Sequence, residues 1–215
     1  MRNKTTKIFL YGLPGILAFV MFSCYPSGPS STAETDVVIT AYDSQFNFGN
    51  IRTYAMPNIV FEIEGTDEVN HDFDDIILDE LEKNMNAIGY VRENNPLVNG
   101  ADVVLIASIG RSDRTWVGGG GWWDWWGGWP GWGYWPGYGP GWGIWYPWPV
   151  MGTFSTGTLF IEMLDPKNPD NNQNRIPARW AAGLNGILSS SSDITTQRII
   201  NNIAQMFTQS SYLGR

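Results

Sequence analysis

The sequence predicts an α+β domain in which a mostly antiparallel sheet carries two amphipathic helices packed on one face. Two stretches with helical periodicity, residues 73–88 and 193–210, are separated by short runs typical of strands. Runs of strands with few helices favour this class over alternating strand–helix units. A Trp- and Gly-rich stretch, residues 116–148, is expected to be an insertion loop between two strands.

Three stretches of the first half predict extended structure. Residues 36–42 are short and rich in β-branched side chains, and residues 46–54 form a second extended piece after a Gly-Asn break. Residues 55–69 are expected to be irregular. Residues 101–109 are continuously apolar, as in a strand covered on one or both faces.

The two helices are predicted from apolar side chains at spacings of three and four. The first occupies residues 73–88, with Asn70 as its N-cap and Gly89 as its stop. The second begins at the N-cap Asp193 and ends near Ser210. Because each has one apolar face, both are expected to cover the same side of the sheet.

The remaining strands are predicted to form a hairpin with a long loop. Residues 153–164 alternate clearly and are expected to be one strand, and residues 176–188 return as its partner. Between them, residues 165–174 are a turn-forming cluster. One face of the first strand carries Leu159, Ile161 and Met163, and the other carries Thr158, Phe160 and Glu162.

The N-terminus has the layout of a secretory signal. A basic start precedes an apolar run of about 15 residues, shorter than the roughly 20 that a membrane-spanning helix needs. Residues 21–24 (Met-Phe-Ser-Cys) resemble a lipobox, with Met and Phe at positions where Leu and a smaller residue are usual. We therefore predict that residues 1–23 are a lipoprotein signal peptide and that Cys24 is lipidated. The alternative is an uncleaved anchor in which Cys24 has no role.

Lipidation would place the mature protein on a membrane. By resemblance to bacterial lipoproteins, Cys24 would carry three acyl chains, palmitate among them, and more than one chain is needed for stable attachment. Tyr25 follows the cysteine in place of Asp, which by resemblance to sorting in enteric bacteria favours the cell outer membrane. Residues 24–35 are predicted to be a flexible tether, residues 36–210 a single domain facing the periplasm, and residues 211–215 a C-terminal tail.

Charge and cysteine usage exclude several classes of function. Cleavage would remove Arg2, Lys4 and Lys7 and no acid, so the net charge of −8 would become −11 in the mature protein. Such an acidic surface repels nucleic acid, which is not an expected partner. The single cysteine excludes an internal disulfide and thiol-based metal sites.

Aromatic residues and glycines are concentrated in residues 116–148, which we call the aromatic segment. It holds eleven of the twelve tryptophans and twelve glycines, with Asp124 as its one charged residue. Gly and Pro would each cost a helix interior about 1 and 3 kcal/mol, so a loop is expected. The candidate binding surface consists of Trp122, Trp123, Trp125, Trp126, Trp129, Trp132, Trp135, Trp142, Trp145 and Trp148.

Three interpretations of the aromatic segment stay open from the sequence. It is a self-packed loop whose rings cover one another, or a platform on which the apolar faces of sugar rings lie. In the third interpretation, it inserts at a membrane interface or contacts a protein.

The sequence offers little support for catalysis. His71, the one histidine, lies beside acids at the start of a helix and is more typical of a solvated helix end than of a general base. Asp165 and Asp170 could hold calcium, but turn formation explains them as well. Residues 118–121 lack the following Lys-Ser or Lys-Thr of a phosphate-binding loop. We therefore expect no catalytic residues, no metal site and no cofactor.

Several motifs occur in an order found in a known family. They are residues 46–54 (FNFGNIRTY), the helix ending at Gly89-Tyr90, the strand after Asn99-Gly100-Ala101-Asp102, the stretch Thr156-Gly157-Thr158-Leu159, Trp180 and the closing helix. With these, residues 36–210 resemble bacterial lipoproteins that contain domain of unknown function 4136. The resemblance implies a lipid-anchored periplasmic α+β domain and transfers no catalytic residues.

The sequence thus favours a non-enzymatic envelope lipoprotein that uses its aromatic segment to bind an envelope protein or cell-wall glycan. The alternative is a carbohydrate-binding module for peptidoglycan or another glycan. A hydrolase that uses a pair of carboxylates, none of which the sequence singles out, is the third hypothesis.

Overall fold

In the computed structural model the chain consists of two units, Met1–Thr35 and Asp36–Arg215. The structure describes residues 36–63, 71–110, 114–116, 142–148, 152–154, 157–185 and 192–214. The predicted signal peptide, tether and lipidation site Cys24 lie outside these residues. Among the described residues, no helix combines the length and apolar composition that crossing a bilayer requires.

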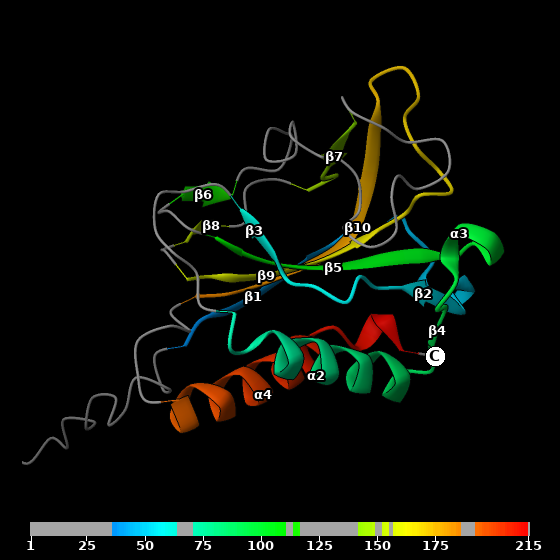
Figure 1. Cartoon of the computed structure of the whole chain (residues 1–215). Helices are drawn as coiled ribbons and strands as arrows, with labels where there is room; N and C mark the ends of the chain where they lie inside the picture. Colours follow the sequence, from blue (N-terminus) through cyan, green and yellow to red (C-terminus); the bar gives the residue numbers. More distant parts are fainter. Residues whose placement is uncertain are drawn as a thin grey trace, which may run out of the picture. The chain divides into compact units, whose positions relative to one another are not determined.

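The architecture is α+β, with a mostly antiparallel sheet, as the sequence predicts (Figure 1). The main sheet runs in the order β1-β10-β9-β5-β2-β4, with β3 also paired to β5 and β7 to β10, and β6 and β8 pair separately. The strands are β1 (Val38–Tyr42), β2 (Thr53–Ala55), β3 (Phe61–Ile63), β4 (Val91–Arg92), β5 (Val103–Gly110), β6 (Arg114–Trp116), β7 (Gly143–Trp145), β8 (Gly152–Phe154), β9 (Leu159–Leu164) and β10 (Arg175–Leu184).

The long strands form the centre of the sheet and pair antiparallel. Strand β9 lies between β5 and β10, and β10 also pairs with β1. The short strands β2, β3 and β7 add parallel pairs at the margins. All eight residues of β5 and all six of β9 are buried, so the centre of the sheet is covered on both faces. Continuous apolarity in β5 is the sequence signal of this arrangement.

Helices α2 (Asp74–Ala87) and α4 (Ser192–Gln209) lie against one face of the sheet (Figure 1). Their apolar sides and one face of the strands form what we call the helix-side core. It contains Ile77, Leu81, Met85, Leu105, Leu159, Ile161, Met163, Trp180, Ile199, Ile203 and Met206 among its buried members. The helical periodicity of α2 and α4 and the alternation of β9 therefore predicted correctly which side chains enter this core.

The helix starts differ from the sequence expectation. Phe73 is the N-cap residue of α2 and makes no side-chain cap hydrogen bond, whereas Asn70 lies outside the described residues. Helix α4 begins at Ser192, so Asp193 lies within it rather than before it. Helix α2 does stop before Gly89, whose φ of 93° suits a residue without a Cβ.

Several other segments depart from the predicted elements. The expected single strand over residues 153–164 is two strands, because β8 pairs with β6 while β9 joins the main sheet. Gly157, with φ of 82°, lies between them and allows the break. Strand β3 occurs in the stretch expected to be irregular. Residues 211–213, expected as part of a tail, form a 3-10 helix whose Leu213 is buried.

A second core covers the opposite face of the sheet. Its buried members are Ala55, Ala101, Val104, Ile106, Ile144, Tyr146, Phe160, Leu164, Ile176, Ala178 and Ala181. Ile144 and Tyr146 come from the end of the aromatic segment, and Trp142 and Trp148 pack against the cluster. We call this cluster the aromatic-side core, because residues 142–148 supply part of its cover.

A β-bulge at Arg179 determines which core each side chain of β10 enters. Ala178 pairs with Leu164 and Trp180 with Met163, so Arg179 is an extra residue relative to β9. Before the bulge, Ile176 and Ala178 face the aromatic-side core, whereas after it Trp180 faces the helix-side core. Without the bulge, strict alternation would have put Trp180 on the same face as Ala178, in the aromatic-side core.

Two buried carboxylates hold the bulge residue. The Arg179 guanidinium donates from Nη1 to Asp43 at 2.7 Å, and from Nε and Nη2 to Asp165 at 3.0 and 2.8 Å. The Asp43 and Asp165 side chains are 10% and 2% exposed. Backbone N–H of Asp43 also donates to the Arg179 carbonyl at 2.8 Å. The pairing thus joins three distant parts of the chain at one point.

Replacing Arg179 with Ala should lower the free energy of unfolding by about 3–5 kcal/mol, because two buried carboxylates would lose their cation. Chemical denaturation monitored by circular dichroism measures the change. Arg52→Ala is the matched control, since Arg52 is exposed and bonds to backbone carbonyls. It should cost less than about 1 kcal/mol. Equal losses in the two variants would contradict the role given to Arg179.

Candidate functional site

The end of the aromatic segment is part of the fold and not a detached loop. Strand β7 pairs in parallel with the start of β10, with Ile144 opposite Ile176 and Trp145 opposite Pro177. Backbone N–H of Gly143 also donates to the carbonyl of Asn174 at 2.8 Å. Three of the ten candidate tryptophans, Trp142, Trp145 and Trp148, therefore lie in or close to a strand that is paired with β10.

The three tryptophans have different surroundings. Trp142 and Trp148 are partly buried against the aromatic-side core, whereas Trp145 is 40% exposed. The structure therefore separates one outward-facing indole from two that pack inward. The other candidates, Trp122, Trp123, Trp125, Trp126, Trp129, Trp132 and Trp135, lie outside the described residues.

A buried tyrosine–glutamate hydrogen bond ties the segment to the sheet. Tyr146 O–H donates to Oε1 of Glu162, and the two residues are 4% and 2% exposed. Oε2 of Glu162 has no hydrogen-bond partner within the described part of the chain. Burial raises the pKa of Glu162 to about 7, and the hydrogen bond from Tyr146 opposes this rise only in part.

A cavity of about 310 Å³ opens beside Trp145, and we call it the Trp145 pocket. This volume is at the small end of the range of about 300–1,000 Å³ for ligand pockets. One aromatic ring, two prolines and four polar side chains surround it. The lining residues are Trp145, Asn168, Pro169, Asp170, Gln173, Pro177 and Arg179.

The hairpin loop forms the polar side of the Trp145 pocket. Asp170 Oδ1 accepts hydrogen bonds from the backbone N–H groups of Asn172 and Gln173 at 3.0 and 3.2 Å. The Asp170 backbone also forms a bridge with Arg175, and Asn174 has a φ of 50°. Turn-forming chemistry therefore explains this loop, as the composition of residues 165–174 predicts.

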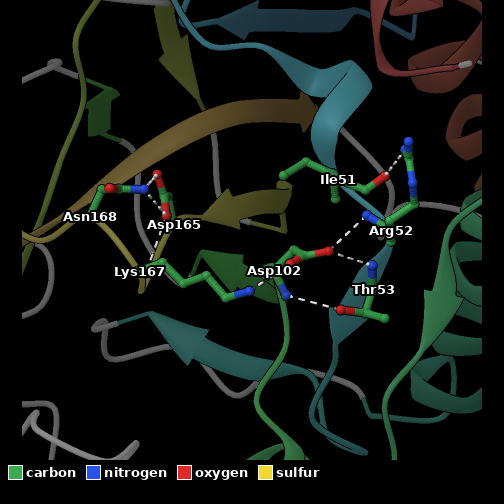
Figure 2. Close-up of polar contacts among 7 residues, drawn as sticks. All are labelled: Ile51, Arg52, Thr53, Asp102, Asp165, Lys167 and Asn168. Atoms are coloured by element: carbon green, nitrogen blue, oxygen red, sulfur yellow. Dashed lines mark hydrogen bonds and ion pairs between the residues drawn. The ribbon is translucent and has the colours of Figure 1, made fainter.

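Further bonds fix the loop to the body of the domain. Asn168 Nδ2 donates to both oxygens of Asp165 at 3.2 and 3.0 Å, and Asp165 itself pairs with Arg179. Lys167 Nζ lies 2.6 Å from Asp102 Oδ1 (Figure 2). The loop is thus held at two places before any ligand binds.

Asp102 extends this network to the start of β2. Its Oδ2 accepts from backbone N–H of Arg52 and Thr53 at 2.8 and 2.9 Å (Figure 2). Burial by itself would raise the pKa of Asp102. Hydrogen bonds from Lys167, Thr53 and Arg52 outweigh burial and lower the pKa to about 2.

Some polar atoms around the pocket already have hydrogen-bond partners within the protein, and others have none among the described residues. All three bonding nitrogens of Arg179 contact Asp43 or Asp165. Within the described residues, Asp170 Oδ2, Asn168 Oδ1 and the Gln173 side-chain amide bond to no other group. These groups are available to a ligand, together with the exposed face of Trp145.

The residues considered for reaction chemistry lie elsewhere or have structural partners. His71 contacts Asp74 at 2.8 Å and Glu62 at 2.9 Å, and its side chain is 46% exposed. These two acids raise its pKa. Asp165 pairs with Arg179 and accepts from Asn168. No group of three or more His, Cys, Asp or Glu suited to a metal ion occurs among the described residues.

Reasoning from sequence missed most of the pocket. Asn168, Gln173 and Arg179 were not singled out, and Glu162 was placed on the correct face without a partner. Membership of Asn168 and Gln173 in a polar turn was the one available signal. That this turn meets Trp145 depends on the pairing of β7 with β10.

Comparison with known families gives a match to domain of unknown function DUF4136 over residues 38–210. A crystal structure of a DUF4136 family protein from Bacteroides thetaiotaomicron is 28% identical, with a TM-score of 0.61, and covers 83% of this chain and 97% of its own. No curated protein matches the chain.

More distant similarity extends to two other solved structures. The PelC dodecamer from Paraburkholderia phytofirmans is 15% identical, with a TM-score of 0.38, over 84% of this chain and 99% of its own. A PDZ domain protein from Parabacteroides distasonis is 14% identical, with a TM-score of 0.42, over 82% of this chain and 36% of its own.

Replacing Glu162 with Gln should change how stability depends on pH. Because the folded pKa of about 7 exceeds the ordinary 4.5, the folded state keeps a proton that the unfolded state releases. Wild-type stability should therefore fall as pH rises from about 4.5 through 7 and stay low above it, a loss of roughly 3 kcal/mol relative to Glu162→Gln.

Urea unfolding of both proteins at pH 4.5 and pH 8 measures this difference. Asp79→Asn, at an exposed position of α2, is the control and should track the wild type at both pH values. A constant difference between wild type and Glu162→Gln across this range would refute the assignment.

Proposed function

The chain belongs to the DUF4136 family, and on that premise we propose that it is a lipid-anchored envelope lipoprotein. In this proposal it is not an enzyme, and its aromatic segment binds another component of the bacterial envelope. The domain stands on the periplasmic side of the outer membrane, tethered through Cys24. The partner is a protein or a cell-wall glycan, not nucleic acid.

The observation that carries this proposal is the position of Trp145. Tryptophan is enriched at contact surfaces, because its flat ring buries a large apolar area and its N–H can still find a polar partner. Trp145 is 40% exposed although its neighbours Ile144 and Tyr146 are buried. Residues 142–148 are thus rigidly held while one indole remains available, which favours binding because little order is lost on contact.

The charge and the pocket support a binding function rather than a reaction. Asp170 supplies the one carboxylate among the described residues that line the Trp145 pocket. Glycoside cleavage uses two carboxylates, so this pocket suits recognition better than hydrolysis. A net charge of −8 disfavours contact with nucleic acid and with anionic lipid.

Cys24→Ser should abolish lipidation, because serine offers no thiol to acylate. The intact mass of the wild type should correspond to residues 24–215 plus acyl chains, whereas the variant should carry neither the cleavage nor the acyl mass. Ser30→Ala in the tether is the control and should match the wild type. If Cys24→Ser matures and partitions with membranes like the parent, the anchor hypothesis is wrong.

Replacing residues 117–141 with a short Gly-Ser linker should weaken binding without unfolding the domain. This change spares β7 and the Tyr146–Glu162 contact. The thermal unfolding midpoint should stay within a few degrees, while co-sedimentation with delipidated envelope fragments should fall. Full co-sedimentation by a variant that carries both this replacement and Trp145→Ala would contradict the binding role.

A further inference from the structure

We propose that the Trp145 pocket is a subsite for a neutral saccharide ring, an inference that rests on the proposed binding function and names its ligand class. The ring would lie with its apolar C–H face on the Trp145 indole, and its hydroxyls would bond to Asn168, Asp170 and Gln173. Turn formation uses Oδ1 of Asp170 and Nδ2 of Asn168, and it leaves Oδ2 of Asp170, Oδ1 of Asn168 and the Gln173 amide for such a ligand.

The lining has the two components that a sugar ring requires. A pyranose has an apolar face of C–H groups and an edge of hydroxyls that both donate and accept. Trp145, 40% exposed, supplies a flat apolar surface, and Pro169 and Pro177 add apolar walls without donors. The side chains of Asn168 and Gln173 are amides, which can also donate and accept.

The hydrogen-bonding groups match hydroxyls better than they match an anion. Asp170 Oδ2 accepts only, and it is held by the turn that fixes Oδ1 with two backbone N–H groups. The one cation of the lining, Arg179, is already paired with two buried carboxylates. A carboxylate or phosphate ligand would therefore face Asp170 without a cation left to offset it.

A cationic ligand fits the lining less well than a sugar. Sites for quaternary ammonium groups are built from several aromatic faces around the charge. Among the described lining residues, Trp145 provides the one aromatic ring. The neutral amides Asn168 and Gln173 would then have no partner in the ligand.

The pocket is organised before binding, which lowers the cost of recognition. Its polar loop is tied down by the bonds of Asp165 to Asn168 and Arg179 and by the contact of Lys167 with Asp102. Its aromatic wall is tied by the pairing of Trp145 with Pro177 and by the neighbouring Tyr146–Glu162 bond. Because both walls are already held, little conformational entropy is lost when a small ligand binds.

Ligand-observed saturation-transfer NMR on the full chain, purified in a polyoxyethylene detergent that carries no sugar headgroup, tests this proposal. The probes are chitotetraose and cellotetraose as neutral sugars, tetragalacturonate as an anion and tetramethylammonium as a cation. We expect saturation of C–H protons on one ring face of a neutral sugar. Trp145→Ala should weaken that binding by about tenfold or more.

Matched variants separate the contact from a loss of folding. Trp145→Phe keeps a flat ring and should retain part of the affinity, and Gln173→Ala should weaken binding by about threefold to tenfold. Gln197→Ala, at an exposed position of α4, should bind like the wild type. Thermal unfolding of each variant confirms that the domain is intact.

Several results would overturn the saccharide subsite. They are silence with both neutral sugars, unchanged binding in Trp145→Ala, or stronger binding of tetragalacturonate or tetramethylammonium. If the sugars fail while the wild type still co-sediments with envelope fragments, the subsite is wrong and the broader binding function stands. If neither occurs, both are wrong.

Discussion

The pairing of Arg179 with Asp43 and Asp165 is the constraint on which the rest of the structure depends. Arg179 is the extra residue of a β-bulge, and the bulge changes which face the following residues of β10 occupy. It brings Trp180 into the helix-side core, where its indole N–H donates to Ser210 at 2.8 Å. A buried charge network thus lies where the register of β10 changes, and loss of its cation would leave two buried carboxylates unpaired.

The same pairing shapes the candidate site. Asp165, held by Arg179, also accepts from Asn168 and so sets the start of the hairpin loop. On the opposite wall, β7 continues the sheet edge and leaves Trp145 beside that loop. The pocket is therefore a by-product of two structural requirements, the turn of the hairpin and the covering of the second sheet face. A ligand that uses it needs no rearrangement of the core.

The aromatic segment both covers one face of the sheet and exposes an indole on the surface. Ile144 and Tyr146 bury a sheet face that the helices do not reach, whereas Trp145 remains exposed between them. Strand alternation explains the contrast, since successive side chains point to opposite sides. Glu162 sits beneath this cover, where burial raises its pKa to about 7.

What the sequence by itself determined is the local pattern: the α+β class, the two helices, the faces of β9, the buried β5 and the turn of residues 165–174. Each follows from periodicity or turn chemistry within a short window. Only the tertiary structure decided the bulge, the start of each helix, the split of β8 from β9 and the pocket. Arg179 and Asp43 are 136 positions apart and Tyr146 and Glu162 are 16 apart, and no local rule pairs them. Such contacts arise because buried charges and hydroxyls need partners, and the folded chain supplies those partners from distant segments.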